Sequence, residues 1–195
     1  YGVGPSAVIS TWLNDEQTIP AADVDWVQEI FRTAPVQNYN LSFSTGNEKS
    51  RHLLSFGYFD QEGVLKHTGF ERISGRFNTD YLVFNRLNIG LNMTSSYAWN
   101  NAVTNNSALG GAIYGAYKFP SIAPVYDING QFAGSPLNDI SNPMGSLYRN
   151  KDNTGKELKL FTNVFADLEI LEGLFIRSNF GIDRKSTRLN SSHYS

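Results

Sequence analysis

Apolar and polar residues alternate strictly along most of the chain. Within segment 36–45, Tyr39, Leu41 and Phe43 occupy alternate positions, and the small polar residues Asn40 and Ser42 lie between them. Because successive side chains of a β-strand point to opposite faces, the pattern predicts a strand with one apolar and one polar face. A polar turn rich in Gly, Asn and Ser leads into a second alternating segment, 51–59, so the two segments predict a β-hairpin.

Four further segments repeat this alternation, which gives six expected strands. They are 70–80, 87–99, 157–170 and 174–182. The connections between the six run short, medium, short, very long and short, which is typical of an up-and-down outer-membrane barrel. A soluble all-β carbohydrate-binding or adhesive module is the alternative, but its strands are typically about 5–6 residues, whereas a tilted membrane strand needs roughly 9–11.

Two regions lack the alternation. Segment 1–35 is irregular and leads into the barrel, with a short helix expected at 21–31 and its cap near Asp23. The connection 100–156 far exceeds the median loop of about 4–6 residues, and loops of that length are usually functional or disordered. A short helix is expected in it at 107–117.

Both ends of the sequence carry signs that it is a piece of something longer. It opens with YGVGPS and no initiator Met, which predicts a truncated start. Residues 183–193 read DRKSTRLNSSH, the same eleven residues that a common short-read sequencing adaptor encodes when it is translated. We therefore expect three parts: the irregular segment 1–35, a partial barrel at 36–182 and a non-native tail at 183–195.

Composition narrows the function classes. Charged residues make up 17% of the chain, aromatic residues 13%, and the net charge is −2, so no basic stripe is available to follow a phosphate backbone and no nucleic-acid partner is expected. The chain has no Cys, which removes thiol nucleophiles and Cys-ligated metals. No apolar run reaches the roughly 18 residues that a membrane helix needs. Any membrane crossing would therefore be made by strands of a β-barrel.

No catalytic, metal or cofactor site is expected. His52 and His67 are separated by a strand and a loop, and neither has a carboxylate at the spacing of a metal site. Asp167 and Glu169 share a strand face, but we expect them to pair with arginines on the lumenal face rather than to work as an acid–base pair. The expected arginine partners are Arg72 and Arg76, or else residues of a plug. The chain is therefore expected not to be an enzyme.

The long connection holds the candidate ligand contacts. Tyr126, Asp127 and Asn129 lie together there, and an aromatic face beside planar carboxylate and amide groups suits sugar rings and their hydroxyls. Asp127 also begins a sequence like part of a calcium loop, but the downstream bidentate acid is missing, which favours a plain turn. Tyr97 and Trp99 end a strand and are interpreted as part of an interfacial aromatic girdle.

Several long motifs resemble the SusC/RagA family of TonB-linked outer-membrane proteins, which are of Bacteroidetes type. They are Asp25-Trp26, Glu29-Ile30-Phe31-Arg32, Ala34-Pro35, Asn38-Tyr39-Asn40-Leu41-Ser42, Gly46-Asn47-Glu48-Lys49-Ser50, Gly57-Tyr58-Phe59-Asp60-Gln61-Glu62-Gly63, Thr68-Gly69-Phe70-Glu71-Arg72, Pro124-Val125-Tyr126-Asp127 and Asn142-Pro143.

This resemblance implies a fragment of a 22-stranded transmembrane barrel that imports oligosaccharides or peptides across the bacterial outer membrane. It also implies a SusD-like surface lipoprotein as partner. Import would be driven by TonB and its inner-membrane motor, which would contact a plug and a TonB-binding segment that are missing from this sequence. On this basis we expect the turn at 46–50 on the periplasmic side and the loop 60–69 on the outside, with the apolar strand faces against the lipid bilayer.

Overall fold

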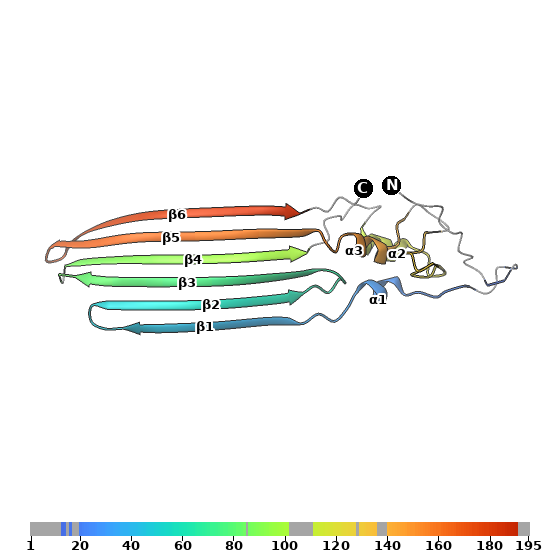
Figure 1. Ribbon diagram of the computed structural model, residues 1–195, viewed down its shortest axis with the longest axis horizontal. Coiled ribbons are helices and arrows are strands. Elements are labelled where there is room, and N and C mark those ends of the chain that lie inside the picture. The colour runs from blue at the N-terminus through green and yellow to red at the C-terminus, as the bar shows by residue number, and fades with distance from the viewer. Residues whose placement is uncertain are drawn as a thin grey trace.

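One antiparallel sheet dominates the fold. The structure is a computed structural model that describes residues 13–14, 16, 20–84, 86–101, 111–127, 129–135 and 140–190. Within these residues six strands lie side by side in the order β1-β2-β3-β4-β5-β6 (Figure 1). Their bounds are Val36–Gly46 (β1), Ser50–Glu62 (β2), Gly69–Val83 (β3), Leu87–Asn101 (β4), Thr154–Leu171 (β5) and Leu174–Asn190 (β6). Each strand pairs with the next one in the chain, which confirms the predicted six-stranded, up-and-down all-β architecture.

The connections alternate between the two ends of the sheet. The β1–β2, β3–β4 and β5–β6 connections are short and lie at one end, and loop 63–68 and the described residues of the β4–β5 connection lie at the other (Figure 1). The strands range from 11 residues in β1 to 18 in β5, longer than the roughly 5–6 residues usual in soluble sheets. Short turns at one end and long loops at the other are the arrangement of outer-membrane barrels.

Three short helices lie beyond the loop end of the strands (Figure 1). They are α1 (Trp26–Ile30), α2 (Ala112–Lys118) and α3 (Pro143–Arg149). Helix α1 begins later than expected, because the carboxylate of Asp25, and not Asp23, accepts a hydrogen bond from the backbone N–H of Gln28 at 3.0 Å. The part of the second expected helix at 107–110 falls outside the described residues. Among the described helices, none is both long and apolar enough to cross a membrane.

The register gathers the apolar side chains on one face of the sheet. Leu41 pairs with Phe56, and the neighbouring pairs on the same face are Tyr39 with Tyr58 and Phe43 with Leu54. These side chains are largely uncovered, with Leu41 at 56% and Phe56 at 52% exposure. A soluble sandwich would cover this face with a second sheet, whereas the described residues contain one sheet only. The apolar face is therefore suited to lipid.

The opposite face is lined by small polar groups. The hydroxyls of Ser42 and Ser55 are 2.7 Å apart across β1 and β2. Asn92 pairs in register with Asn78 on one side and Asn163 on the other, so three amides form a row across β3, β4 and β5. Such a face is compatible with water in a barrel lumen.

Aromatic residues mark both ends of the strands. Near the loop end the rings of Tyr97 and Trp99 lie 5.6 Å apart, and those of Tyr39 and Tyr58 stack at 6.4 Å. At the turn end, Phe84 is 90% exposed. Aromatic side chains concentrate at the two membrane–water interfaces, so these positions agree with the predicted girdle.

Strand β6 is longer than the sequence pattern predicted. The expected strand ended at Ile182, but pairing with β5 continues to Asn190. Arg184 pairs with Leu160, and period-two alternation puts it on the same face as Phe180 and Ile182. Backbone pairing does not depend on side-chain type, so β5 can pair with a segment that lacks the apolar pattern. The non-native origin of 183–195 and the three-part division remain predictions.

The two faces can be tested with one pair of neighbouring residues in the full-length protein. Leu41→Arg places a charge on the apolar face and should destabilise the membrane-inserted barrel by about 2–4 kcal/mol. Asn40→Arg, one residue away on the polar face opposite Gly57, should cost little. Denaturant titration of the protein folded into lipid vesicles measures both changes. Equal losses for the two variants would contradict the assignment of faces.

Candidate functional site

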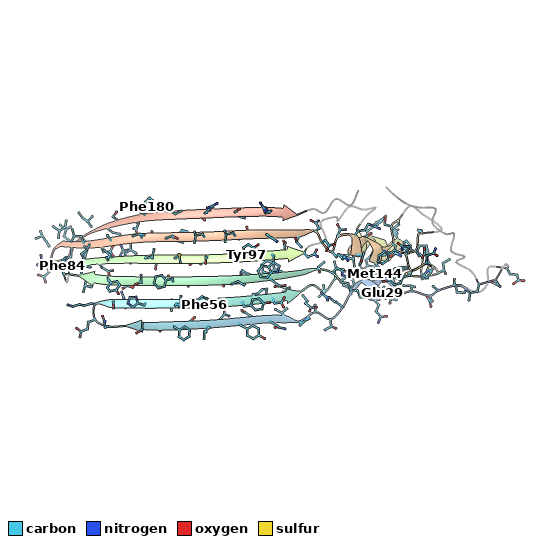
Figure 2. The ribbon with its side chains drawn as sticks, in the orientation of Figure 1. Glu29, Phe56, Phe84, Tyr97, Met144 and Phe180 are labelled. Atoms are coloured by element: carbon cyan, nitrogen blue, oxygen red, sulfur yellow. The ribbon has the colours of Figure 1, made fainter. Side chains whose placement is uncertain are left out.

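The described buried core lies outside the sheet, in a cap at the loop end. We define the cap as residues 20–35, 63–68 and the described part of 111–153. Figure 2 shows Met144 and Glu29 in the cap, beyond the strands that carry Phe56 and Tyr97. Its core cluster consists of Trp26, Ile30, Ala112, Ala116, Phe119, Ala123, Met144 and Leu147. Residues that precede β1 and residues of the β4–β5 connection therefore share one hydrophobic core.

Trp26 is the centre of this core. Its side chain is 3% exposed, its ring meets that of Phe119 edge-on at 4.8 Å, and its indole N–H donates to the carbonyl of Pro120 at 3.0 Å. The backbone N–H of Val24 donates to the carbonyl of Ser121 at 2.9 Å. Segment 20–31 is thus held against a stretch of chain about ninety residues later.

Asn142 organises the other half of the cap. It is 5% exposed, and its amide nitrogen donates to the carbonyls of Val125 and Ala133, both at 3.0 Å. Its amide oxygen caps α3 by accepting from the N–H of Gly145 at 3.1 Å. One side chain therefore joins the turn at 125–133 to the start of α3. The Asn-Pro pair at 142–143 is a recognisable helix start, and it was the available signal for this unexpected helix.

The loop between β2 and β3 completes the cap. The N–H of Arg32 donates to the carbonyl of Val64 at 2.8 Å, and the N–H of Lys66 donates to the carbonyl of Ile30 at 3.0 Å. Two ion pairs, Arg32 with Glu62 and Lys66 with Glu29, add to this joint at 2.9 and 3.0 Å. Because both pairs are partly exposed, they contribute little, and the backbone contacts fix the loop.

The three predicted ligand contacts fall in one tight turn. One carboxylate oxygen of Asp127 accepts from the backbone N–H groups of Asn129 and Gln131, both at 2.8 Å. Asp127 therefore shapes the turn, in the way that Asx side chains commonly do. Tyr126 is 52% exposed and pairs through its backbone with Phe132 across the turn. Asn129 is exposed at the tip.

Four rings that are distant in sequence meet beside this turn. Phe132 lies between Tyr126 at 5.2 Å and Tyr148 at 5.4 Å, and Tyr148 meets His67 edge-on at 5.9 Å. We call Tyr126, Phe132, Tyr148 and His67 the aromatic track. The ammonium of Lys151 lies 3.8 Å from the centre of the Tyr148 ring. Sequence reasoning found only Tyr126, because no local spacing links a turn, a helix and the β2–β3 loop.

His67 has two unusual properties. Its φ of 63° lies in the left-handed region, which few residues other than glycine adopt. Partial burial lowers the pKa of its imidazole, and the nearby positive charges of Lys151, Arg32 and Lys66 lower it further. The cap therefore favours the neutral imidazole.

Comparisons with known proteins identify the chain's relatives. No family model matches it. It is 29% identical over 174 residues to the TonB-dependent receptor P3 of Formosa agariphila, an alignment that covers 86% of this chain and 17% of that receptor. It is 30% identical over 132 residues to the TonB-dependent receptor SusC of Bacteroides thetaiotaomicron, covering 64% of this chain and 12% of SusC. The chain thus spans less than a fifth of the length of these relatives.

The fold leads to the same group. The structure of the RagAB peptide transporter superposes with a TM-score of 0.70 at 25% identity, over 85% of this chain and 19% of the matched chain. The chain corresponds to a section of a SusC/RagA-like TonB-dependent receptor. SusC and RagA are outer-membrane β-barrel proteins, which confirms the predicted outer-membrane location. The relatives are receptors and transporters rather than enzymes.

In a barrel of this kind the polar face of the sheet borders the lumen. There Asp167 forms a two-pronged ion pair with Arg177 of β6, at 2.5 and 2.8 Å. The expected partners, Arg72 and Arg76, are therefore wrong for Asp167: β5 and β6 are neighbours, and the register brings Arg177 directly opposite Asp167. The guanidinium of Arg72 instead lies 5.7 Å from the ring centre of Phe59.

His52 and His67 lie in different parts of the structure, and each has contacts of its own. His52 contacts the hydroxyl of Thr79 through Nδ1 at 2.7 Å, and its ring lies edge-on to Tyr81 at 5.3 Å. His67 belongs to the cap. Within the part of the chain that the structure describes, no group of three or more His, Asp or Glu side chains is placed to hold a metal ion.

Removal of the Trp26 side chain should loosen the cap while the sheet stays paired. Trp26→Ala in the full-length receptor deletes a buried ring and leaves the Pro120 carbonyl without its donor, a change that typically costs about 3–5 kcal/mol. We expect faster hydrogen–deuterium exchange in α1, α2 and α3 and little change in β1–β4. Tyr117→Ala, on the same cap but 73% exposed, is the matched control. Cap exchange that is the same in both variants would contradict the central role of Trp26.

The cap should also respond to pH through His67. Because its pKa is lowered in the folded cap, unfolding takes up a proton below about pH 6.5. Cap stability is therefore full above that pH, declines as the pH falls from about 6.5 toward the lowered pKa, and levels off below it. Exchange of cap amides at about pH 7.5 and 5.5, corrected for intrinsic rates, measures this decline.

The control is His67→Asn, because Asn accepts the left-handed backbone but does not titrate. This variant should lose most of the pH dependence. A dependence that is undiminished in His67→Asn would assign the effect to another group.

Proposed function

We propose that the whole protein is a TonB-dependent active importer of oligosaccharides or peptides, working with a SusD-like surface lipoprotein. The observation that carries the proposal is the match to both SusC and the RagAB transporter, in sequence and in fold, over most of this chain. TonB and its inner-membrane motor would act through parts of the protein outside this section. The protein is proposed to have no catalytic residues and to use no metal or cofactor.

The described residues supply three elements that such an importer needs. The apolar sheet face contacts the bilayer, the polar face borders the lumen, and the cap stands at the outer mouth. Within the cap we propose that Tyr126 and Asn129 contact the substrate, and that Asp127 contributes by holding the turn on which they lie. Because the cap has its own core, it presents these groups in a fixed arrangement.

Uptake measurements test the importer directly. In a host that carries the complete gene, deletion of the gene should abolish accumulation of one labelled oligosaccharide or peptide class, and loss of TonB should have the same effect. The protein should also co-purify with a surface lipoprotein. Uptake that persists after deletion of the gene, or that does not depend on TonB, would refute the proposal.

A further inference from the structure

Two arginines on the polar face, both near the turn end of the sheet, belong to ion pairs. Arg51 of β2 pairs with Asp80 at 2.8 Å, and Arg177 of β6 pairs with Asp167 at 2.5 Å. In each case the register puts the aspartate directly opposite the arginine on the neighbouring strand. The positive charges of these two arginines are therefore neutralised within the sheet.

Arg72 and Arg76 of β3 lie on the same face but in the half of the strand that begins at the loop end, and both are exposed. Each is flanked in the register only by uncharged residues: Phe59 and Ala98 for Arg72, Ser55 and Thr94 for Arg76. Among the ion pairs between described residues, none includes either arginine. The sheet therefore does not neutralise these two charges.

The described residues of β1–β5 place one carboxylate in the loop-end half of the polar face, and that carboxylate is already bound. Glu157 of β5 pairs with the ammonium of Lys159 at 3.0 Å and with that of Lys185 at 2.7 Å. Lys185 falls in the tail that is predicted to be non-native, but Lys159 alone balances the charge of Glu157. This half of the lumenal wall therefore has an excess of positive charge, which Arg72 and Arg76 carry.

Aromatic rings hold the Arg72 side chain in place. Its guanidinium lies 5.7 Å from the ring centre of Phe59, within the roughly 6 Å of a cation–π contact. The ring of Phe70 in turn packs edge-on against Phe59 at 6.0 Å. Because a side chain that is already ordered loses less entropy when a ligand binds, Arg72 is preorganised for an anion.

The chemistry and spacing of the two arginines indicate the class of ligand. A planar guanidinium matches the paired oxygens of a carboxylate or a similar oxyanion. Four residues along a strand separate the two Cα atoms by about 13 Å, so the arginines can bind separate acidic groups of one extended molecule.

We propose that Arg72 and Arg76 form an anion-binding site in the lumenal wall, which selects cargo that carries several acidic groups. The inference rests on the proposed function, which places the loop end of the sheet at the outer mouth. It adds the charge of the cargo: an acidic oligosaccharide or an acidic peptide.

Binding by the detergent-solubilised full-length transporter tests the site with matched pairs of probes. The pairs are oligogalacturonate with its methyl ester, sulfated oligosaccharides with their desulfated forms, and glutamate-rich peptides with their glutamine counterparts. Wild-type protein should bind at least one acidic probe more tightly than its neutral counterpart, and added salt should reduce the difference. The probe that binds shows whether the acidic groups belong to an oligosaccharide or to a peptide.

Substitutions then test the two arginines. Arg72→Gln and Arg76→Gln should each weaken binding of the acidic probe about tenfold, and the double variant about a hundredfold, because each loses one charge-assisted contact. Binding of the neutral counterpart should not change. Arg72→Lys should retain part of the affinity, since it keeps the charge but not the planar fork. The matched control is Arg51→Gln, on the same face but at the turn end, which should leave the affinity unchanged.

A purely structural role for the two arginines predicts a different result. If they pair with carboxylates elsewhere in the whole receptor, the double variant should lose stability in denaturant titration but keep its affinity for the acidic probe, and that result would overturn the site. A wild-type transporter that binds none of the acidic probes more tightly than their neutral counterparts would also overturn it. In both cases the importer stands. If acidic probes bind through the arginines but the host shows no TonB-dependent uptake, the importer is refuted while the site stands.

Discussion

The register of the backbone ladder is the constraint on which the rest of the structure depends. With a side-chain period of two, a slip of one residue between β1 and β2 would move Leu41 and Phe56 to the polar face and bring Asn40 toward lipid. In a membrane every backbone group must also find a partner within the protein. Pairing and alternation therefore have to agree on all six strands, and the register shows that they do from β1 to the first half of β6.

A sheet with lipid on one face and a lumen on the other has no hydrophobic core of its own. The described core lies in the cap, where α1, α2 and α3 surround Trp26. The two parts of the fold are therefore stabilised differently. The strands present an apolar face that suits lipid, and the cap is held together by its own buried core. Because α1 directly precedes β1 and α3 directly precedes β5, the cap is anchored at two well-separated strands.

Much of the sheet could be predicted from the sequence, because alternation is a local signal that each strand carries by itself. The prediction failed at strand ends, as in β3, which runs from Gly69 to Val83 rather than 70–80. At these strand ends, backbone pairing with the neighbouring strand continues beyond the residues that alternate between apolar and polar. The predicted arginine partners of Asp167 were wrong, because the partner of an ion pair depends on which strands are neighbours in the sheet. The aromatic track was missed for the same reason, since Tyr148 and His67 are brought together only by the folded cap.

The second half of β6 shows what backbone pairing can and cannot establish. Residues 183–190 continue the ladder of β5 and β6 without a break in register, yet Arg184 falls on the apolar face in line with Phe180 and Ile182. An arginine at such a position opposes insertion unless it lies close to an interface. The backbone groups of a strand edge can pair with a segment of almost any sequence. A strand that crosses a bilayer must in addition present apolar side chains on its lipid face. The prediction that the native barrel sequence stops near Ile182 therefore rests on the face pattern, which ends there, and not on the pairing, which continues to Asn190.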